Sequence, residues 1–446
     1  MSKKRFPLKT IKKTIASGKP DSSLILSRYF PVDYSQKWGK FTLEERFRLI
    51  ELLPLSSSTE VFERLSPYYQ KELLSLLNTS LLSSLLNRMA PDERADMFSF
   101  LGAEEADNLL LLMKREEARD VRDLLEYEET TAGGIMTTEF VALSPNMTAR
   151  EALETIQETV KGEKVRKIYA VYVTDDEGRL LTGISLQRLL ATAPDSAIKD
   201  ITRPVAGIKV NIKQDQELVA ELFAHYDLLS APVVTDDDTL VGVITIDDII
   251  DVMNEEVGED IAYRAGTEVI DFETGSVYRS VMKRAPWLMI CFFGGIAAAG
   301  IIGVFEDALA QVAAIAVFIP LILDMGGNVG VQTSTVVVRR IAVSRGEIDW
   351  RHVVAGELTA GLLISVIFGL LIGIFASFIY SIEIGQASGL GITAVLAMAT
   401  VFGVFLPVIL HKFKIDPAVA TGPVITTIID VVGIGVYFLF AVYFVL

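Results

Sequence analysis

Residues 353–381 read VVAGELTAGLLISVIFGLLIGIFASFIYS, and this stretch carries a single charged side chain, Glu357. About 20 apolar residues in a helix are enough to cross the roughly 30 Å hydrocarbon core of a bilayer. Four other stretches in the C-terminal half have a similar apolar character. The five predicted spans are residues 285–305, 311–338, 353–381, 388–410 and 418–446. The sequence therefore predicts an integral membrane protein with an all-α membrane domain at residues 283–446.

The loops that join these spans alternate in charge. Basic residues gather before the first span, between the second and third, and between the fourth and fifth. They are Lys283, Arg284, Arg339, Arg340, Arg345, Arg351, Lys412 and Lys414, whereas the other two loops carry Glu306, Asp307 and Glu383 and no lysine or arginine. Loops rich in Lys and Arg remain on the cytoplasmic side of a membrane. We therefore expect the N-terminal half in the cytoplasm and the C-terminus outside.

The net charge is concentrated ahead of the spans. The chain of 446 residues has a formal net charge of −16, from 41 Lys and Arg and 57 Asp and Glu. Residues 283–446 hold eight of the basic and nine of the acidic residues, which leaves −15 for residues 1–282. Such an acidic surface repels nucleic acid and attracts cations. We therefore expect a cation partner and no nucleic acid.

Two further classes of protein are disfavoured. The chain has no Walker A sequence, so ATP-driven pumping is not expected, and no nucleophile–base set that would indicate an enzyme. Its one cysteine, Cys291, lies inside a predicted span, so no disulfide forms within the soluble half.

Three acids fall within the predicted spans, namely Asp324, Glu357 and Asp430. An ionisable group in lipid costs at least about 2.5–3.5 kcal/mol, so it normally faces protein or water. Asp430 follows Thr427 by about one turn in GPVITTIIDVVG (residues 422–433). Magnesium takes oxygen ligands and dehydrates reluctantly. We therefore expect Asp430 to contact a hydrated divalent cation, with one carboxylate from each chain of a dimer.

The second span contains PLILDMGGNVGVQTST, residues 320–335, with three glycines and Pro320. Two interpretations are open. The helix is broken there and offers freed carbonyls as ligands, or the glycines only let neighbouring helices pack closely.

The soluble half has three predicted parts. Residues 1–41 form a basic N-terminal segment, and residues 42–130 an acidic, all-α superhelical N domain of short stacked helices. We expect the acids Glu93, Asp96, Glu104 and Glu105 on exposed turns, where they serve the helix dipole. The third part, residues 131–253, is an α/β repeat.

This repeat is visible as VYVTDDEGRLLTGIS (171–185) and APVVTDDDTLVGVIT (231–245), each within a strand, helix, strand, turn, strand, helix pattern. It resembles a tandem pair of CBS domains. In that family the cleft between repeats often binds an adenine nucleotide, and an Asp three residues after Ser or Thr contacts the ribose. The second repeat keeps this pair as Thr245 and Asp248, whereas the first has Ser185 followed by Arg188. The alternative is a structural pair without a ligand.

The linker that follows is the most acidic part of the chain. Residues 247–273 hold one base, Arg264, and ten acids: Asp247, Asp248, Asp251, Glu255, Glu256, Glu259, Asp260, Glu268, Asp271 and Glu273. Such a run often forms only a solvated face. Alternatively, close carboxylates repel by roughly 1 kcal/mol or more per pair at intermediate dielectric. Bound magnesium would then hold acidic surfaces together, as an ion-sensing switch.

The order of these parts resembles the MgtE family of magnesium channels and transporters along nearly the whole chain. The motifs are RAPWL at 284–288, GGNVGVQ at 326–332, and DPA at 416–418, followed by Gly422-Pro423, Thr427 and Asp430. The resemblance implies a homodimer in the cell inner (plasma) membrane. It also implies a magnesium-selective pore site at Asp430, with Thr427, Gly326 and Asn328 as further pore residues. Val331 departs from the polar residue that many members have there.

The resemblance further implies closure of the pore by intracellular Mg²⁺, tuned by ATP at the CBS pair. The Mg²⁺ binds to the N domain and to the connecting (plug) helix within residues 254–282. The regulatory metal ligands expected by position and charge are Asp92, Asp96, Asp247, Asp251, Glu255, Glu256, Glu259 and Asp260.

Two alternatives to a channel were weighed. A proton- or sodium-coupled divalent cation transporter or exporter would use Glu357 or Asp324 as a relay. A CBS-containing chloride channel is disfavoured, because such proteins carry the CBS domains after the spans.

Overall fold

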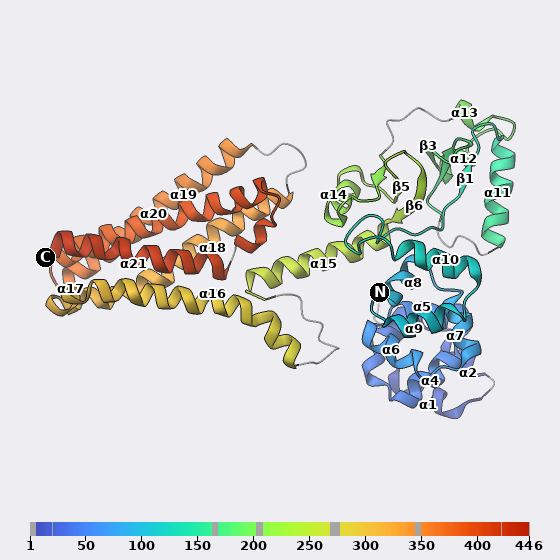
Figure 1. Cartoon of the computed structure of the whole chain (residues 1–446), viewed down its shortest axis with the longest axis horizontal. Helices are drawn as coiled ribbons and strands as arrows, with labels where there is room; N and C mark the ends of the chain where they lie inside the picture. Colours follow the sequence, from blue (N-terminus) through green and yellow to red (C-terminus); the bar gives the residue numbers. More distant parts are fainter. Residues whose placement is uncertain are drawn as a thin grey trace. The chain divides into compact units, whose positions relative to one another are not determined.

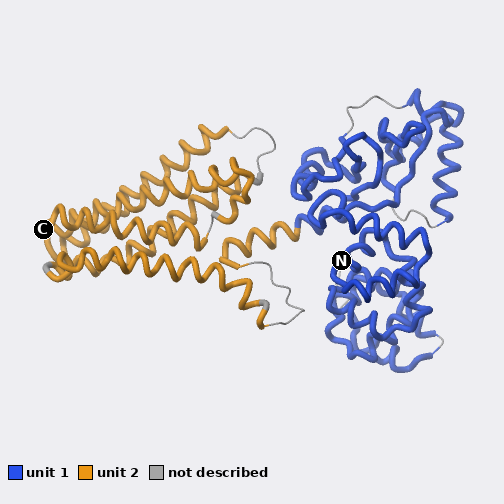
Figure 2. The backbone as a smooth tube through the Cα atoms, in the orientation of Figure 1, with its two compact units in different colours: residues 1–253 blue, residues 254–446 orange. Residues whose placement is uncertain are grey.

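The computed structural model describes residues 6–19, 21–162, 168–201, 208–267, 277–343, 349–420 and 422–445. The chain divides into two compact units, residues 1–253 and 254–446 (Figure 2). Four residues used in the sequence analysis lie outside the described residues: Glu268, Asp271, Glu273 and Arg345.

The first part of unit 1 is a stack of short helices (Figure 1). They are α1 (Leu8–Ser17), α2 (Ser22–Leu26), α3 (Pro31–Ser35), η1 (Trp38–Lys40), α4 (Leu43–Leu52), α5 (Leu55–Glu63), α6 (Pro67–Leu74), α7 (Thr79–Leu86), α8 (Pro91–Ser99), α9 (Ala103–Leu110) and α10 (Arg115–Leu124). Proline opens α3, α6 and α8, where its missing N–H leaves no bond unmade. Thr42 and Glu45 form a capping box at α4. The predicted all-α domain is confirmed.

This helical domain begins earlier than the predicted boundary at residue 42. Ile11, Leu26 and Trp38 are buried in one hydrophobic core with Leu73 and Val121 from later helices. In the described part of residues 1–41, apolar side chains join the core of the helical domain despite the basic charge of this segment.

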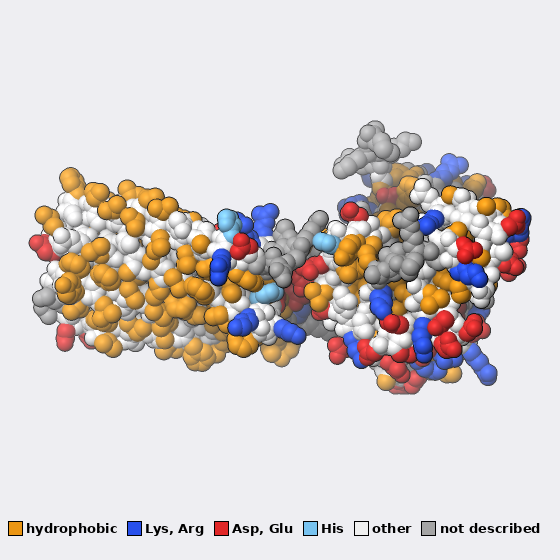
Figure 3. Space-filling model, turned by 90° about the horizontal axis from the view of Figure 1, so that it is seen from above, with side chains coloured by type: hydrophobic (Ala, Val, Ile, Leu, Met, Phe, Trp, Pro, Cys, Tyr) orange, Lys and Arg blue, Asp and Glu red, His pale blue; other side chains and the backbone are white. Residues whose placement is uncertain are grey.

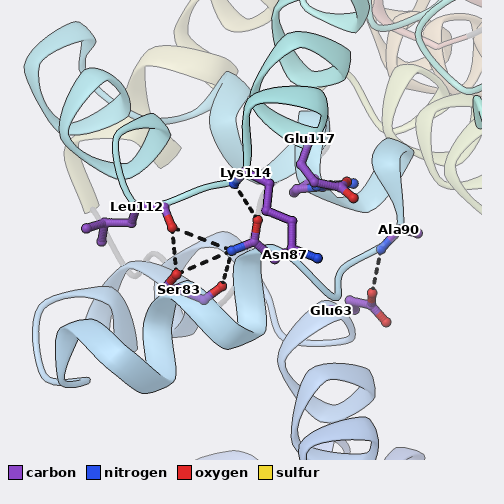
Figure 4. A network of polar contacts seen from close by, with 8 residues as sticks. Glu63, Ser83, Asn87, Ala90, Leu112, Lys114 and Glu117 are labelled. Atoms are coloured by element: carbon purple, nitrogen blue, oxygen red, sulfur yellow. Dashed lines mark hydrogen bonds and ion pairs between the residues drawn. The ribbon is translucent and has the colours of Figure 1, made fainter. Parts of the chain in front are cut away.

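Asn87 ties successive helices of the stack together (Figure 4). Its Nδ2 donates hydrogen bonds to the carbonyls of Ser83, at 2.7 Å, and Leu112, at 3.5 Å. Its Oδ1 accepts one from the N–H of Lys114 at 2.7 Å. The bonds to Leu112 and Lys114 satisfy backbone groups in the connection between α9 and α10, where no intrahelical partner exists.

The second part of unit 1 contains two three-stranded sheets of the same topology. The strands are β1 (Ala142–Leu143), β2 (Ala170–Thr174), β3 (Leu180–Ser185), β4 (Val210–Asn211), β5 (Ser230–Val234) and β6 (Leu240–Thr245). The first strand of each sheet is parallel to the second, and the second is antiparallel to the third. The predicted tandem repeat is confirmed.

Helices flank these sheets and continue beyond them. They are α11 (Ala149–Lys161), α12 (Leu186–Leu190), α13 (Ile198–Ile201), α14 (Gln216–Tyr226) and α15 (Ile246–Arg264). The predicted connecting helix is therefore the continuation of the last helix of the second repeat, and it ends at Arg264. The predicted boundary between residues 253 and 254 falls inside α15.

Among the described residues of unit 2, five helices are long and apolar enough to cross a membrane. The candidate spans are Ser280–Val304, Ala313–Ile341, Trp350–Ile379, Ile382–Lys412 and Pro423–Val445. They come from α16 (Val277–Val304), η2 (Ala313–Phe318) with α18 (Ile319–Val343), α19 (Trp350–Ile379), α20 (Ile382–Lys412) and α21 (Pro423–Val445); α17 (Glu306–Gln311) and η3 (Pro417–Ala420) are short connections. The side of this unit seen in Figure 3 is largely apolar. The five predicted spans are confirmed.

Small residues bring the membrane helices close together. A Cβ atom at Gly389 of α20 would lie 2.8 Å from the carbonyl oxygen of Gly369 of α19. In α18, a Cβ at Gly326 would lie 2.9 Å from Ile429 Cγ2, and one at Gly330 would collide with the same side chain. Because α18 is continuous from Ile319 to Val343, the broken-helix interpretation is wrong and the close-packing interpretation is confirmed.

Candidate ion path and acidic regulatory sites

Asp430 lies on α21 beside a tightly packed interface. Its neighbour Ile429 is buried against Gly326, whereas Asp430 itself is half-buried. The methyl group of Thr427, one turn earlier, packs against Gly294 of α16. In the described part of the chain no three Asp, Glu, His or Cys side chains are grouped so as to hold a metal ion. A lone carboxylate suits contact with an ion that keeps its water shell.

The two predicted pore residues of α18 have different surroundings. Gly326 is buried and helical, so its backbone belongs to the continuous helix and its surface serves contact with α21. Asn328 is exposed, and its Nδ2 donates a hydrogen bond to Asp324 Oδ1 at 3.3 Å. Asn328 therefore offers polar atoms to a path, whereas Gly326 positions the helix.

The C-terminal end of α15 packs against the first turn of α21. Gly422 has φ +93°, and a Cβ there would lie 2.5 Å from the carbonyl oxygen of Arg264. Gly266 has φ +69°, and a Cβ there would lie 2.5 Å from Pro423 Cγ. The ring of Tyr263 lies 6.2 Å from that of Trp287 on α16. Both glycines permit a close approach and a left-handed backbone that other residues rarely adopt.

Carboxylates gather beside this contact. Burial, followed by the charges of Asp416 and Glu259, raises the pKa of Asp260 despite the opposing effect of Arg264. Burial and Glu259 likewise raise the pKa of Asp416, although the Ala418 N–H donates a hydrogen bond to its Oδ1 at 2.7 Å. Glu259 and Asp260 were predicted as ligands and Asp416 was not. The sequence feature that could have pointed to Asp416 is a carboxylate in an otherwise basic loop, immediately before Pro417.

The other two predicted acids of the connecting helix lie earlier in α15. Glu255 is exposed and Glu256 half-buried. Neither is among the charges that raise the pKa values of Asp260 and Asp416.

Unit 1 contains an acidic cleft of about 950 Å³ between the helical stack and the CBS pair. Eight acids line it: Glu60, Glu63, Asp92, Glu93, Glu139, Asp247, Asp248 and Asp251. The described lining also includes two basic residues, Arg64 and Arg88. The cleft thus brings together three predicted regulatory ligands, Asp92, Asp247 and Asp251. A cation would relieve the repulsion among so many carboxylates.

The pKa of Glu93 reflects the burial of this side chain and the many negative charges in this cleft. Burial, followed by the charges of Asp92, Glu63, Asp96 and Asp248, raises its pKa to about 9. The expectation that Glu93 lies on an exposed turn was therefore wrong, whereas Asp96 is exposed as expected.

Glu63 reaches the cleft from a different helix. It ends α5, and its Oε1 accepts a hydrogen bond from the Ala90 N–H at 2.9 Å (Figure 4). Sequence analysis missed Glu63 and Glu139, because nothing local distinguishes them from surface acids.

The predicted nucleotide pair caps a helix. The Thr245 N–H and hydroxyl donate hydrogen bonds to Asp248 Oδ2, at 3.3 Å and 2.7 Å. Asp248 also faces the acidic cleft. A smaller pocket next to Thr245 is lined by Tyr169, Tyr172 and Ser230 among others. This pocket has a volume of only about 10 Å³, which is room for about one water molecule and not for a ribose.

Three family models match the chain. The model described as a divalent cation transporter matches residues 319–440, and that of the MgtE intracellular N domain matches residues 29–130. The CBS domain model matches residues 132–185 and 198–255.

Named relatives match over much of their length. The magnesium transporter MgtE of Thermus thermophilus is 32% identical over 420 residues, covering 93% of this chain and 92% of that protein. The magnesium transporter MgtE of Enterococcus faecalis is 35% identical over 319 residues, covering 71% and 70%.

Two solved structures resemble the soluble half. One is described as the cytosolic domain of the Mg²⁺ channel MgtE in complex with ATP. It has a TM-score of 0.52 at 32% identity and covers 54% of this chain and 98% of that chain. The other, the soluble part of a magnesium transporter, has a TM-score of 0.50 at 31% identity and covers 56% and 96%.

Proposed function

Because the chain belongs to the MgtE family of magnesium transporters, we propose that it is a magnesium-selective channel closed by intracellular Mg²⁺. The ion is the transported substrate and also the regulatory ligand. The protein spans the inner (plasma) membrane as a homodimer, with its acidic domains in the cytoplasm and its C-terminus outside, as the charges of the loops indicate.

The contact between the end of α15 and the start of α21 carries this proposal. Gly422 at that contact lies eight residues before Asp430, or about 12 Å along the helix. A displacement of α15 therefore acts directly on the helix that bears the proposed pore carboxylate.

Ion binding supplies the energy for closure. Hydrated Mg²⁺ near Glu259, Asp260 and Asp416, contacted through its water shell, would offset their mutual repulsion and hold the end of α15 in place. Within unit 1, Mg²⁺ in the acidic cleft would hold the helical stack against the CBS pair. A ligand shifts a conformational equilibrium only by its difference in affinity for the two states. The two acid clusters would provide this difference in affinity. Each cluster combines carboxylates from two surfaces, so it would bind Mg²⁺ more tightly when those surfaces are in contact.

The proposed path residues Asp430 and Asn328 offer oxygen atoms to the permeating ion. Asp430 attracts Mg²⁺ without stripping its water, which allows the ion to leave again. Two chains would place two such carboxylates around one path. ATP would act at the CBS pair through Thr245 and Asp248, and its effect on closure would pass through α15, which begins directly after Thr245.

Electrical recording of the full chain in a planar bilayer tests the proposal. Wild type should show unitary Mg²⁺ currents that fall as cytoplasmic Mg²⁺ rises. Asp430→Ala should reduce them at least tenfold, because the path loses its carboxylate, whereas Glu357→Gln should retain them.

The coupled-transporter alternative predicts a different result. Flux that requires a proton or sodium gradient, without unitary steps, and that is lost in Glu357→Gln would contradict the channel and support coupling.

A further inference from the structure

Helix α18 carries a polar stripe on a face that the other described helices leave uncovered. Asp324, Asn328 and Gln332 recur every four residues, and all three are exposed. At 1.5 Å per residue, the stripe extends over about 12 Å of the helix. The apolar residues Leu321 and Val336, also exposed, lie beyond its two ends.

Lipid is an unsuitable neighbour for this face. A carboxylate at bilayer depth is costly, and the amides of Asn328 and Gln332 would add unmet hydrogen bonds. Asn328 already donates to Asp324 Oδ1 at 3.3 Å, which leaves most of that carboxylate's acceptor capacity for another group. The stripe therefore faces water or a second copy of the chain.

The packing of α18 on α21 gives the depth of Asp324. Gly326 meets Ile429, and Gly330 meets both Ile429 and Ile425, so the two helices run antiparallel. On α18, Asp324 comes two residues before Gly326. On α21, Asp430 comes one residue after Ile429. In antiparallel helices, a step back along one and a step forward along the other lead towards the same side of the membrane. Both shifts point in the same direction. The two carboxylates are therefore within a few ångströms of one another in height.

We propose that Asp324, held by Asn328, is a second carboxylate of the ion path, where it contacts the hydrated divalent cation at the depth of Asp430. This deepens the proposed channel function and rests on it. Two acids from each chain give the path a stronger negative field than Asp430 alone. The second carboxylate favours divalent over monovalent cations, since attraction scales with the ion's charge.

Cysteine accessibility tests whether the stripe faces water. In the full chain with Cys291→Ser, a cysteine in place of Asp324 should react with a membrane-impermeant cationic thiosulfonate. A cysteine in place of Leu362, an exposed apolar position on α19, should remain unreactive. Protection of the Asp324→Cys thiol by millimolar Mg²⁺ would support cation contact. A thiol that no aqueous reagent reaches from either side would overturn the proposal.

Recording of Asp324→Asn tests the role of its charge. The Mg²⁺ concentration for half-maximal current should rise by about threefold or more, with a larger Na⁺ to Mg²⁺ permeability ratio. Asp324→Glu should restore both values. Glu383→Gln, which removes an exposed acid at the start of α20, should behave as wild type.

The outcomes separate this inference from the proposed function. An Asp324→Asn channel with unchanged affinity and selectivity, beside an inactive Asp430→Ala, overturns the role of Asp324 alone. Wild-type currents in Asp430→Ala contradict the proposed channel site itself.

Discussion

Individual carboxylates in this protein differ in what surrounds them. Asp430 is half-buried on one membrane helix, with a buried isoleucine beside it. Glu93 lies among other acids in a cleft of the soluble half. The first arrangement suits a passing ion, because a single charge attracts without trapping. The second arrangement holds a proton or a cation, because several charges repel one another until one is neutralised.

Glu93→Gln should stabilise the soluble half at alkaline pH in the absence of Mg²⁺. The pKa of Glu93 rises from 4.5 to about 9 on folding, so the folded state retains a proton that the unfolded state releases. The stability gained from that proton is present below about pH 4.5 and is lost as the pH rises towards 9. Glutamine keeps the neutral form throughout.

The gain should be on the order of 5 kcal/mol at pH 8 and near zero at pH 4.5. Urea denaturation of a fragment ending at residue 267 measures it, and Glu104→Gln on the exposed start of α9 is the control. Equal gains at both pH values would show that the pKa of Glu93 is not raised.

At the scale of secondary-structure elements, the contact on which the proposed closure depends joins the end of α15 to the start of α21. Two glycines with positive φ allow it: Gly266 follows the end of α15, and Gly422 precedes the start of α21. The carbonyl end of α15 meets the N-terminal end of α21, an arrangement in which opposite partial charges of two helix dipoles face one another. Helix α15 thus runs from the end of the second repeat to a direct contact with the start of α21.

Gly422→Ala should weaken closure by Mg²⁺. The added methyl group would lie 2.5 Å from the Arg264 carbonyl oxygen at a φ of +93°, which costs about 1–3 kcal/mol of strain. The end of α15 would then move away, and closure would require severalfold more cytoplasmic Mg²⁺.

The control for this prediction is Gly300→Ala on α16, where a Cβ meets nothing within 4 Å. Current recordings over a Mg²⁺ series give the closing concentration of each variant. An identical closing concentration for Gly422→Ala and wild type would exclude this contact as the coupling point.

At the scale of the whole molecule, charge and hydropathy divide the chain. Nearly all of the net charge of −16 belongs to residues 1–282, whereas the five spans are apolar. In the proposed channel, the soluble half would respond to cytoplasmic cations and the membrane half would offer them a path. Transport through the membrane half would then change the occupancy of the acidic sites in the soluble half.

Mg²⁺ should protect the connecting segment of the full-length protein from proteolysis. Bound ions hold the acidic surfaces together, so cleavage between residues 255 and 275 should slow severalfold as Mg²⁺ rises into the millimolar range. The same ionic strength of NaCl is the control, since screening alone acts equally with either salt. Cleavage that is independent of Mg²⁺ would contradict the proposed sensing.

The sequence by itself determined the five spans, the helical domain and the tandem repeat. Each depends on a local pattern: sustained hydropathy, a 3.6-residue period, or alternating strands and helices. It also predicted Asp430 as a pore residue, because an acid within an apolar span differs from its neighbours.

Only the tertiary structure decided which acids meet. Asp416 reaches Glu259 and Asp260, and Glu93 reaches Asp248, although these residues are far apart in the chain. The tertiary structure also shows that the glycines of α18 form a packing surface and that Gly422 contacts the end of α15. The physical reason is that such meetings depend on how helices pack over long sequence separations, which no local pattern of residues encodes.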